Sequence, residues 1–206
     1  DNVESRGLGD VYKRQSMGKK RVVITGMGAI TPIGNNLIEY TSALKNGLSG
    51  CEEIKSFDTT KFKTKFACEV KSYDPLDYFD RKESRKMDIF SQFGMIAAEE
   101  AIIHSEINLD KINKNRVGVI WGSGVGGIGT FQNELINFAE NDKNPRFNPF
   151  FIPKLIPDIC PGIIAIKYDF RGPNFATVSA CASGSNAIID AYNLSLIHIS
   201  EPTRLH

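Results

Sequence analysis

Residues 176–193 read ATVSACASGSNAIIDAYN, and this stretch predicts a strand, a sharp turn and a helix in succession. The run that ends in Ser179-Ala180-Cys181 suits a buried strand, and the run that follows the small residues has the spacing of a helix. Cys181 is therefore predicted at the amino-terminal end of a helix. A helix N-terminus favours the thiolate, which is the reactive form of cysteine.

Cys181 has two interpretations, a catalytic nucleophile or a buried structural cysteine, and the residues alone leave both open. As a nucleophile, Cys181 would also offer its own backbone N–H to an oxyanion. A catalytic cysteine usually needs a base. None of the three histidines, His104, His198 and His206, is placed in the sequence as a credible partner.

The composition limits the class of protein. The chain has 206 residues, of which 41% are hydrophobic and 24% charged, as expected for one globular domain or part of a larger one. Its net charge is +1, and it has neither the basic stripe of a nucleic-acid binder nor an apolar run long enough to span a bilayer. Its four cysteines show neither C-x-x-C pairs nor metal-ligand spacing. These features predict a reduced cytoplasmic protein without a metal site.

Both ends of the chain look foreign to the domain between them. Residues 1–16 lack periodicity, and residues 195–206 break the preceding helical pattern and contain Pro202. Both ends resemble translated adapter or vector sequence, and a disordered native tail at each end is the alternative. We expect a non-native leader over 1–16, a domain over 17–194 whose last helix ends near Leu194, and a non-native tail.

Strands alternate with helices along the domain, which predicts an α/β layered fold with mostly buried strands. The clearest helix is predicted over residues 81–104, where apolar residues recur at helical spacing. Residues 141–161 contain five prolines among aromatic and aliphatic residues, which indicates an ordered apolar loop. The other predicted elements are strands within 21–26, 62–70, 116–121 and 175–180, and helices over 36–46, 128–140 and 162–169.

A glycine-rich segment, GSGVGG, matches the G-x-G-x-x-G pattern at Gly122, Gly124 and Gly127. A dinucleotide site also requires an acidic residue about twenty positions on, at the end of the next strand. Glu140 and Asp142 have that spacing but fall in the end of a helix and in a loop. Tight turns and close backbone packing are therefore the favoured interpretation. A dinucleotide-binding domain that uses these glycines is the alternative of another class.

We interpret the polar residues of the predicted 81–104 helix as stabilising the helix and not as catalytic groups. His104 near its end would favour the helix C-terminus as a cation. Arg85 and Asp88 lie three residues apart and would pair along the helix surface.

Six segments resemble, in the same order, β-ketoacyl-acyl-carrier-protein synthases, and most closely the type II elongation enzyme of bacterial fatty acid synthesis. The resemblance covers about residues 19–194. The segments are RVVITGMGAITPIG, KFACEVKSYDP, RKMDIFSQFGMIAAEEA, GVIWGSGVGG, NPFFIPKLIPDICPGIIAIKYDFRGPN and TVSACASGSNAI.

The resemblance implies a fold, an assembly and site residues. The fold is the N-terminal βαβαβαββ half of a thiolase-like, five-layer αβαβα architecture that forms homodimers. Cys181 would be the nucleophile that forms the acyl thioester and donates its N–H to the oxyanion hole, and Val125 would line the acyl tunnel. The second oxyanion donor, two histidines and a lysine belong to the C-terminal half of such enzymes. The chain by itself is therefore expected to be inactive in condensation and to expose apolar surface.

The implied reaction is the decarboxylating condensation of an acyl-enzyme with malonyl-acyl-carrier-protein in fatty acid elongation. The implied partners are acyl carrier protein and a second copy of the chain. No cofactor is implied beyond the phosphopantetheine arm that carries the substrates. A ketosynthase of a polyketide or aryl-polyene pathway is the alternative within this class. Non-catalytic chain-length-factor subunits share the fold but lack the cysteine, so Cys181 argues against them.

Overall fold

The computed structural model describes residues 21–200, with the backbone alone for residues 197–200. Its centre is a pair of parallel strands, β3 (Val119–Gly122) and β4 (Asn174–Thr177), in which the first residues of the two strands are register partners. These strands confirm the predictions within 116–121 and 175–180.

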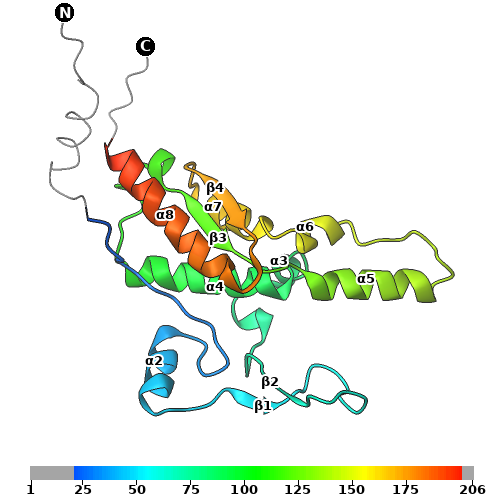
Figure 1. Cartoon of the computed structure of the whole chain (residues 1–206). Helices are drawn as coiled ribbons and strands as arrows, with labels where there is room; N and C mark the ends of the chain where they lie inside the picture. The colour runs from blue at the N-terminus through cyan, green and yellow to red at the C-terminus, as the bar shows by residue number, and fades with distance from the viewer. Residues whose placement is uncertain (1–20, 201–206) are drawn as a thin grey trace, which may run out of the picture.

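Three helices surround this strand pair. Helices α7 (Ile159–Tyr168) and α8 (Ser183–Ser200) each pack on both strands, and α4 (Ile89–His104) packs on α7 (Figure 1). Helices therefore cover the sheet in layers, as predicted.

Helix α2 (Leu37–Lys45) forms as its end residues predict. Asn36 caps it, since the Asn36 side chain accepts a hydrogen bond of 2.8 Å from the Glu39 backbone N–H. Gly47 follows the helix with a φ of +64°, which glycine adopts without strain. Strand β1 (Cys51–Glu53) pairs antiparallel with β2 (Phe66–Cys68), and two 3-10 turns, η1 (Pro75–Asp77) and η2 (Lys114–Arg116), lie further along the chain.

The strand predicted within residues 21–26 is not formed, so this prediction is wrong. The segment has no regular structure, and Ile24 is 82% exposed. Just after it, the Ala29 backbone N–H donates to the Glu100 carboxylate of α4 over 2.8 Å. A strand needs a neighbouring strand to receive its hydrogen bonds, and no strand within residues 21–200 pairs with this segment.

The helix predicted over 81–104 is interrupted. Helix α3 (Arg81–Ser84) ends early, and Asp88 then adopts an extended conformation and caps α4. The Asp88 side chain is buried and accepts a hydrogen bond from the Thr130 hydroxyl. The predicted surface pair between Arg85 and Asp88 is therefore wrong, because the Asp88 carboxylate faces inward to a cap and to another helix.

The proline-rich region is more helical than predicted. Helix α5 (Ile128–Glu140) confirms its prediction, but residues 141–161 contain α6 (Phe151–Leu155) and the start of α7 in place of a continuous loop. Pro153 and Pro161 occupy first turns, where a helix N–H has no acceptor in its own helix and can be missing. The aromatic residues of this region stack, as Phe147 does on Phe151, so its ordered apolar character is confirmed.

The last helix is longer than predicted. Helix α8 continues past Leu194, because residues 195–200 contain no proline or glycine that would stop it. Residues 1–16 and 201–206 lie outside the described part of the chain. The non-native origin of both ends stays a prediction.

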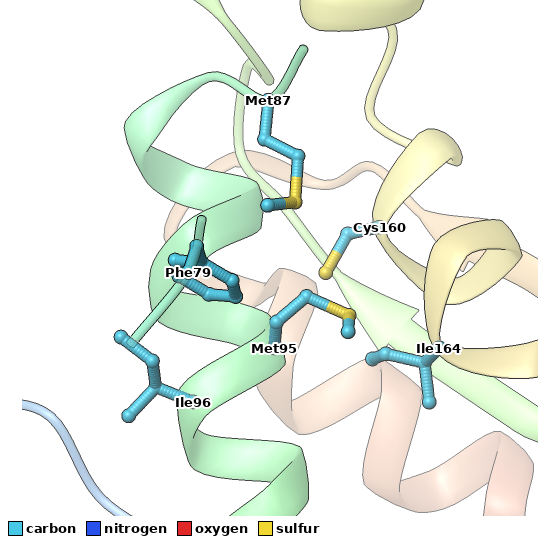
Figure 2. Close-up of a cluster of buried hydrophobic side chains, with 6 residues drawn as sticks. All are labelled: Phe79, Met87, Met95, Ile96, Cys160 and Ile164. Carbon is cyan, nitrogen blue, oxygen red and sulfur yellow. The ribbon is translucent and has the colours of Figure 1, made fainter. Parts of the chain in front are cut away.

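The main hydrophobic core lies between α4, α7 and the segment that precedes α4. Figure 2 shows Met87 and Met95 pointing toward Cys160 and Ile164 of α7, with Phe79 and Ile96 alongside α4. Gly94 on α4 is part of this packing, since a Cβ there would overlap Cys160 Sγ. The members are Phe79, Met87, Met95, Ile96, Cys160 and Ile164.

Large apolar side chains are also exposed, as expected. Ile166 on α7 is 83% exposed, and Ile188 on α8 is 70% exposed. Within residues 21–200, no helix combines the length and the apolar character needed to cross a bilayer.

Candidate active site

Two loops meet at the carboxyl ends of β3 and β4. Because these strands are parallel, with Gly122 opposite Thr177, the loops leave the sheet at the same edge. We call residues 122–127, which lead into α5, the glycine loop, and residues 178–182, which lead into α8, the cysteine turn (Figure 1). The two loops are adjacent, since a Cβ on Gly124 would stand 3.5 Å from the carbonyl oxygen of Ala180.

Cys181 is the middle residue of the 3-10 turn η3 (Ala180–Ala182), which runs directly into α8. Ala180 has a φ of +50°, a left-handed conformation that is strained for alanine. Strand, sharp turn and helix therefore follow one another as predicted. The Cys181 side chain is exposed, which contradicts the interpretation as a buried structural cysteine.

The other three cysteines have different environments. Cys160 is fully buried, and burial raises the pKa of its thiol to about 12. Cys51 and Cys68 are exposed but lie on the separate β1–β2 sheet. Within the described chain, Cys181 is the exposed cysteine beside a helix N-terminus.

The backbone N–H of Cys181 is available as a donor. In the cysteine turn, the Ala182 N–H donates to the Ser179 carbonyl oxygen over 3.0 Å, and the Ser183 N–H donates to the Ala180 carbonyl oxygen. Among residues 21–200, no protein acceptor receives the Cys181 N–H. An oxyanion formed at Cys181 can therefore accept this hydrogen bond, as the nucleophile interpretation requires.

No described histidine serves as a base for Cys181. His104 ends α4, and its Nδ1 accepts a 3.0 Å hydrogen bond from the Met27 backbone N–H. This hydrogen bond links the segment before α2 to the end of α4, and the predicted interaction of His104 with the helix end stays a prediction. The side chains of His198 and His206 lie outside the described residues. Within residues 21–200, no cluster of three His, Cys, Asp or Glu side chains could hold a metal ion.

The glycine loop is packed against protein backbone. A Cβ on Gly127 would overlap the Lys154 carbonyl oxygen of α6, and a Cβ on Gly122 would overlap the first turn of α8. Close backbone packing, the favoured interpretation of these glycines, is confirmed. Glu140 ends the 13-residue helix α5, about 20 Å from the loop at 1.5 Å per residue, where a dinucleotide ribose could not reach it. Val125, the predicted tunnel residue, is 60% exposed in this loop.

We expect Gly127→Ala to destabilise the chain by about 1–3 kcal/mol, because the added methyl must displace α6. Gly129→Ala is the matched control, since a Cβ at this position would meet no atom within 4 Å beyond the adjoining backbone of α5. Alanine is the better helix former, so the control should stabilise the chain by about 0.5–1 kcal/mol. Urea unfolding followed by the fluorescence of the single tryptophan, Trp121, measures both. Equal effects of the two substitutions would contradict the packing role.

Sequence reasoning missed the polar side chains that hold the site. Thr177 Oγ1 donates a 2.8 Å hydrogen bond to the Ser183 carbonyl oxygen, and the Asn186 side-chain amide donates a 2.7 Å hydrogen bond to Ser179 Oγ. The hydroxyl residues on both sides of Cys181 were a local signal for such contacts. Their partners depend on the backbone path of the turn, which the sequence does not reveal.

The chain belongs to a known family of condensing enzymes. Residues 19–198 match the β-ketoacyl synthase N-terminal domain family, and this match covers most of the chain. Membership confirms the resemblance on which the expectations for Cys181 rest.

The chain is similar in sequence to proteins named 3-oxoacyl-[acyl-carrier-protein] synthase 2. The synthase 2 of Synechocystis sp. is 41% identical over 180 residues, which cover 87% of this chain and 43% of the relative. The synthase 2 of Staphylococcus aureus is 43% identical over 177 residues, which cover 85% of this chain and 42% of the relative. The chain therefore spans about two fifths of the length of these relatives.

Solved structures confirm the fold class, the N-terminal half of a thiolase-like fold. The ishigamide ketosynthase/chain length factor superposes with a TM-score of 0.81 at 23% identity, covering 88% of this chain and 45% of that one. A ketosynthase solved with a type II polyketide acyl carrier protein superposes with a TM-score of 0.69 at 27% identity, covering 85% and 46%.

Proposed function

We propose that this chain supplies the nucleophile of a 3-oxoacyl-[acyl-carrier-protein] synthase that elongates fatty acids by decarboxylating condensation. The observation that carries the proposal is the position of Cys181: exposed, on a strained turn, at the N-terminus of α8 and beside the glycine loop. Its backbone N–H, which has no acceptor among residues 21–200, supplies one oxyanion donor. The identity of 41–43% to synthases named for this reaction supports the substrate class.

In the first half-reaction, Cys181 Sγ attacks the thioester carbonyl carbon of an acyl group on the phosphopantetheine arm of acyl carrier protein. The carbonyl oxygen becomes negative and accepts the Cys181 N–H. The bond to the pantetheine sulfur then breaks, and that sulfur leaves as a thiol with the proton that Cys181 gave up. An acyl thioester on Cys181 remains.

In the second half-reaction, malonyl-acyl-carrier-protein loses carbon dioxide, and the electron pair left on its α-carbon attacks the acyl carbonyl carbon. The bond from that carbon to Cys181 Sγ breaks, its electron pair returns to the sulfur, and the resulting thiolate takes a proton from water to restore the free cysteine. A second oxyanion donor and the two histidines and lysine implied for the malonyl site would come from residues outside this chain.

The reaction involves two protein partners. Acyl carrier protein delivers both substrates, a second copy of the enzyme completes a homodimer, and the reaction takes place in the cytoplasm. Val125, which follows Gly124 in the loop beside the cysteine turn, would line the acyl tunnel. No cofactor is needed beyond the phosphopantetheine of the carrier protein. A polyketide ketosynthase has the same first half-reaction, but the solved polyketide enzyme is only 27% identical.

The test is a chimera in which residues 19–194 replace the matching segment of the Staphylococcus aureus synthase. With octanoyl- and malonyl-acyl-carrier-protein, we expect the chimera to form 3-oxodecanoyl-acyl-carrier-protein, detected by mass spectrometry. A chimera that melts in one cooperative transition, forms a dimer and yet makes no 3-oxoacyl product would contradict the proposal. The unaltered Staphylococcus aureus enzyme is the positive control.

A further inference from the structure

The residue directly after the cysteine turn carries a buried hydroxyl without an assigned role. Ser183, the first residue of α8, is 3% exposed. Its Oγ accepts a 2.9 Å hydrogen bond from the Ser179 backbone N–H and donates a 2.7 Å hydrogen bond to the Ala180 carbonyl oxygen. This hydroxyl, two residues after Cys181, therefore binds the two residues directly before that cysteine, and both its donor and an acceptor position are in use.

The hydrogen bond to Ala180 acts on the same peptide unit as the Cys181 N–H. The Ala180 carbonyl and the Cys181 N–H belong to one planar, trans peptide, so they point in opposite directions. The carbonyl is turned toward the buried Ser183 hydroxyl, so the N–H is turned away from it. Ala180 is left-handed, with a φ of +50°, and such a conformation persists only where its surroundings hold it.

We propose that Ser183 is a positioning residue for acyl transfer: its hydroxyl orients the Ala180–Cys181 peptide so that the Cys181 N–H faces the developing oxyanion. This inference rests on the proposed function. Two further hydrogen bonds brace the same turn, from Thr177 to the Ser183 carbonyl oxygen and from Asn186 to Ser179. Ser183 thus acts through the backbone of Cys181 and does not itself touch the substrate.

The experiment compares two reactions of Cys181 in the full chain. With p-nitrophenyl octanoate, Cys181 Sγ attacks the ester carbonyl carbon, p-nitrophenolate leaves with the bonding electron pair, and the thiol proton passes to the buffer. This acylation forms an oxyanion, whereas alkylation by iodoacetamide displaces iodide at a saturated carbon and forms none. Peptide mass spectrometry gives both rates at Cys181, and Cys160, which is fully buried, reports on unfolding in the same sample.

We expect Ser183→Ala to lower the ratio of acylation rate to alkylation rate at Cys181 by about tenfold or more, since a misplaced oxyanion donor slows only acylation. Ser183→Thr keeps the hydroxyl and should restore the ratio to within about threefold of the unsubstituted chain. Ser185→Ala, at an exposed serine of the same helix turn, should leave it unchanged.

An unchanged ratio in Ser183→Ala, or an equal loss in Ser183→Thr, would overturn the inference. If Cys160 becomes reactive in Ser183→Ala, that variant has unfolded, and Asn186→Ala, which removes the hydrogen bond to Ser179, is measured in its place. A lower ratio of acylation to alkylation at Cys181 then supports positioning by the turn, and an unchanged ratio overturns it. Rapid labelling of Cys160 in the unsubstituted chain would contradict the structure from which the inference comes. The synthase proposal is judged separately, by condensation in the chimera, so the two failures are distinguishable.

Discussion

Replacement of Cys181 by alanine is expected to abolish condensation by the chimera, with a fall of roughly a thousandfold or more in rate. The alanine methyl cannot hold the acyl group between the two half-reactions. The turn should survive, because Ala180 and Ala182 already place small side chains on both sides. Formation of 3-oxodecanoyl-acyl-carrier-protein is the measurement.

The matched control for this loss is Cys68→Ala. Cys68 is an exposed cysteine on β2, away from the β3–β4 sheet that presents Cys181. Its removal should leave the condensation rate within about twofold, which is near the scatter expected of surface substitutions. Condensation that survives Cys181→Ala would refute the assignment of the nucleophile.

Asp88→Ala is expected to cause the largest loss of stability among the substitutions considered, about 2.5–4 kcal/mol in the free energy of unfolding. The N-cap of α4 contributes about 1 kcal/mol. The hydrogen bond that the buried carboxylate accepts from Thr130 contributes about 1.5–3 kcal/mol, since a charged acceptor takes part. Urea unfolding followed by Trp121 fluorescence measures the loss.

Asp80→Ala measures how much a helix cap contributes to stability when its carboxylate is not buried. Asp80 caps the short helix α3 through the Lys82 and Glu83 N–H groups, but it is exposed. Its loss should cost only about 0.5–1 kcal/mol. If both aspartates cost the same, the buried link between α4 and α5 contributes nothing to stability.

Local signals predicted the parts of the fold that depend on neighbouring residues. Asn36 and Gly47 marked the ends of α2, and the small residues around Cys181 marked a sharp turn into a helix. The split at Asp88 was missed, although an aspartate before an apolar helical run is a capping signal. The apolar pattern continues across the break, because Met87 is buried in the core although it belongs to neither helix. The pattern therefore does not reveal where one helix ends and the next begins.

Features that depend on distant residues could not be predicted. The apolar residues near Ile24 indicated a buried strand, but a strand forms only where a partner receives its hydrogen bonds. The contact between the glycine loop and the cysteine turn follows from the pairing of β3 with β4, which local sequence does not specify. The Ser183 bridge depends on the left-handed Ala180, a conformation that alanine rarely adopts.

The most direct test of the central claim, that Cys181 is the acyl-carrying nucleophile, is the mass of its peptide. The chimera is incubated with octanoyl-acyl-carrier-protein without malonyl substrate, quenched in acid and digested. We predict that the peptide containing Cys181 gains the mass of one octanoyl group, while the peptides containing Cys51, Cys68 and Cys160 stay unmodified. An unmodified Cys181 peptide in the folded chimera, or octanoylation at another of these cysteines, would contradict the account.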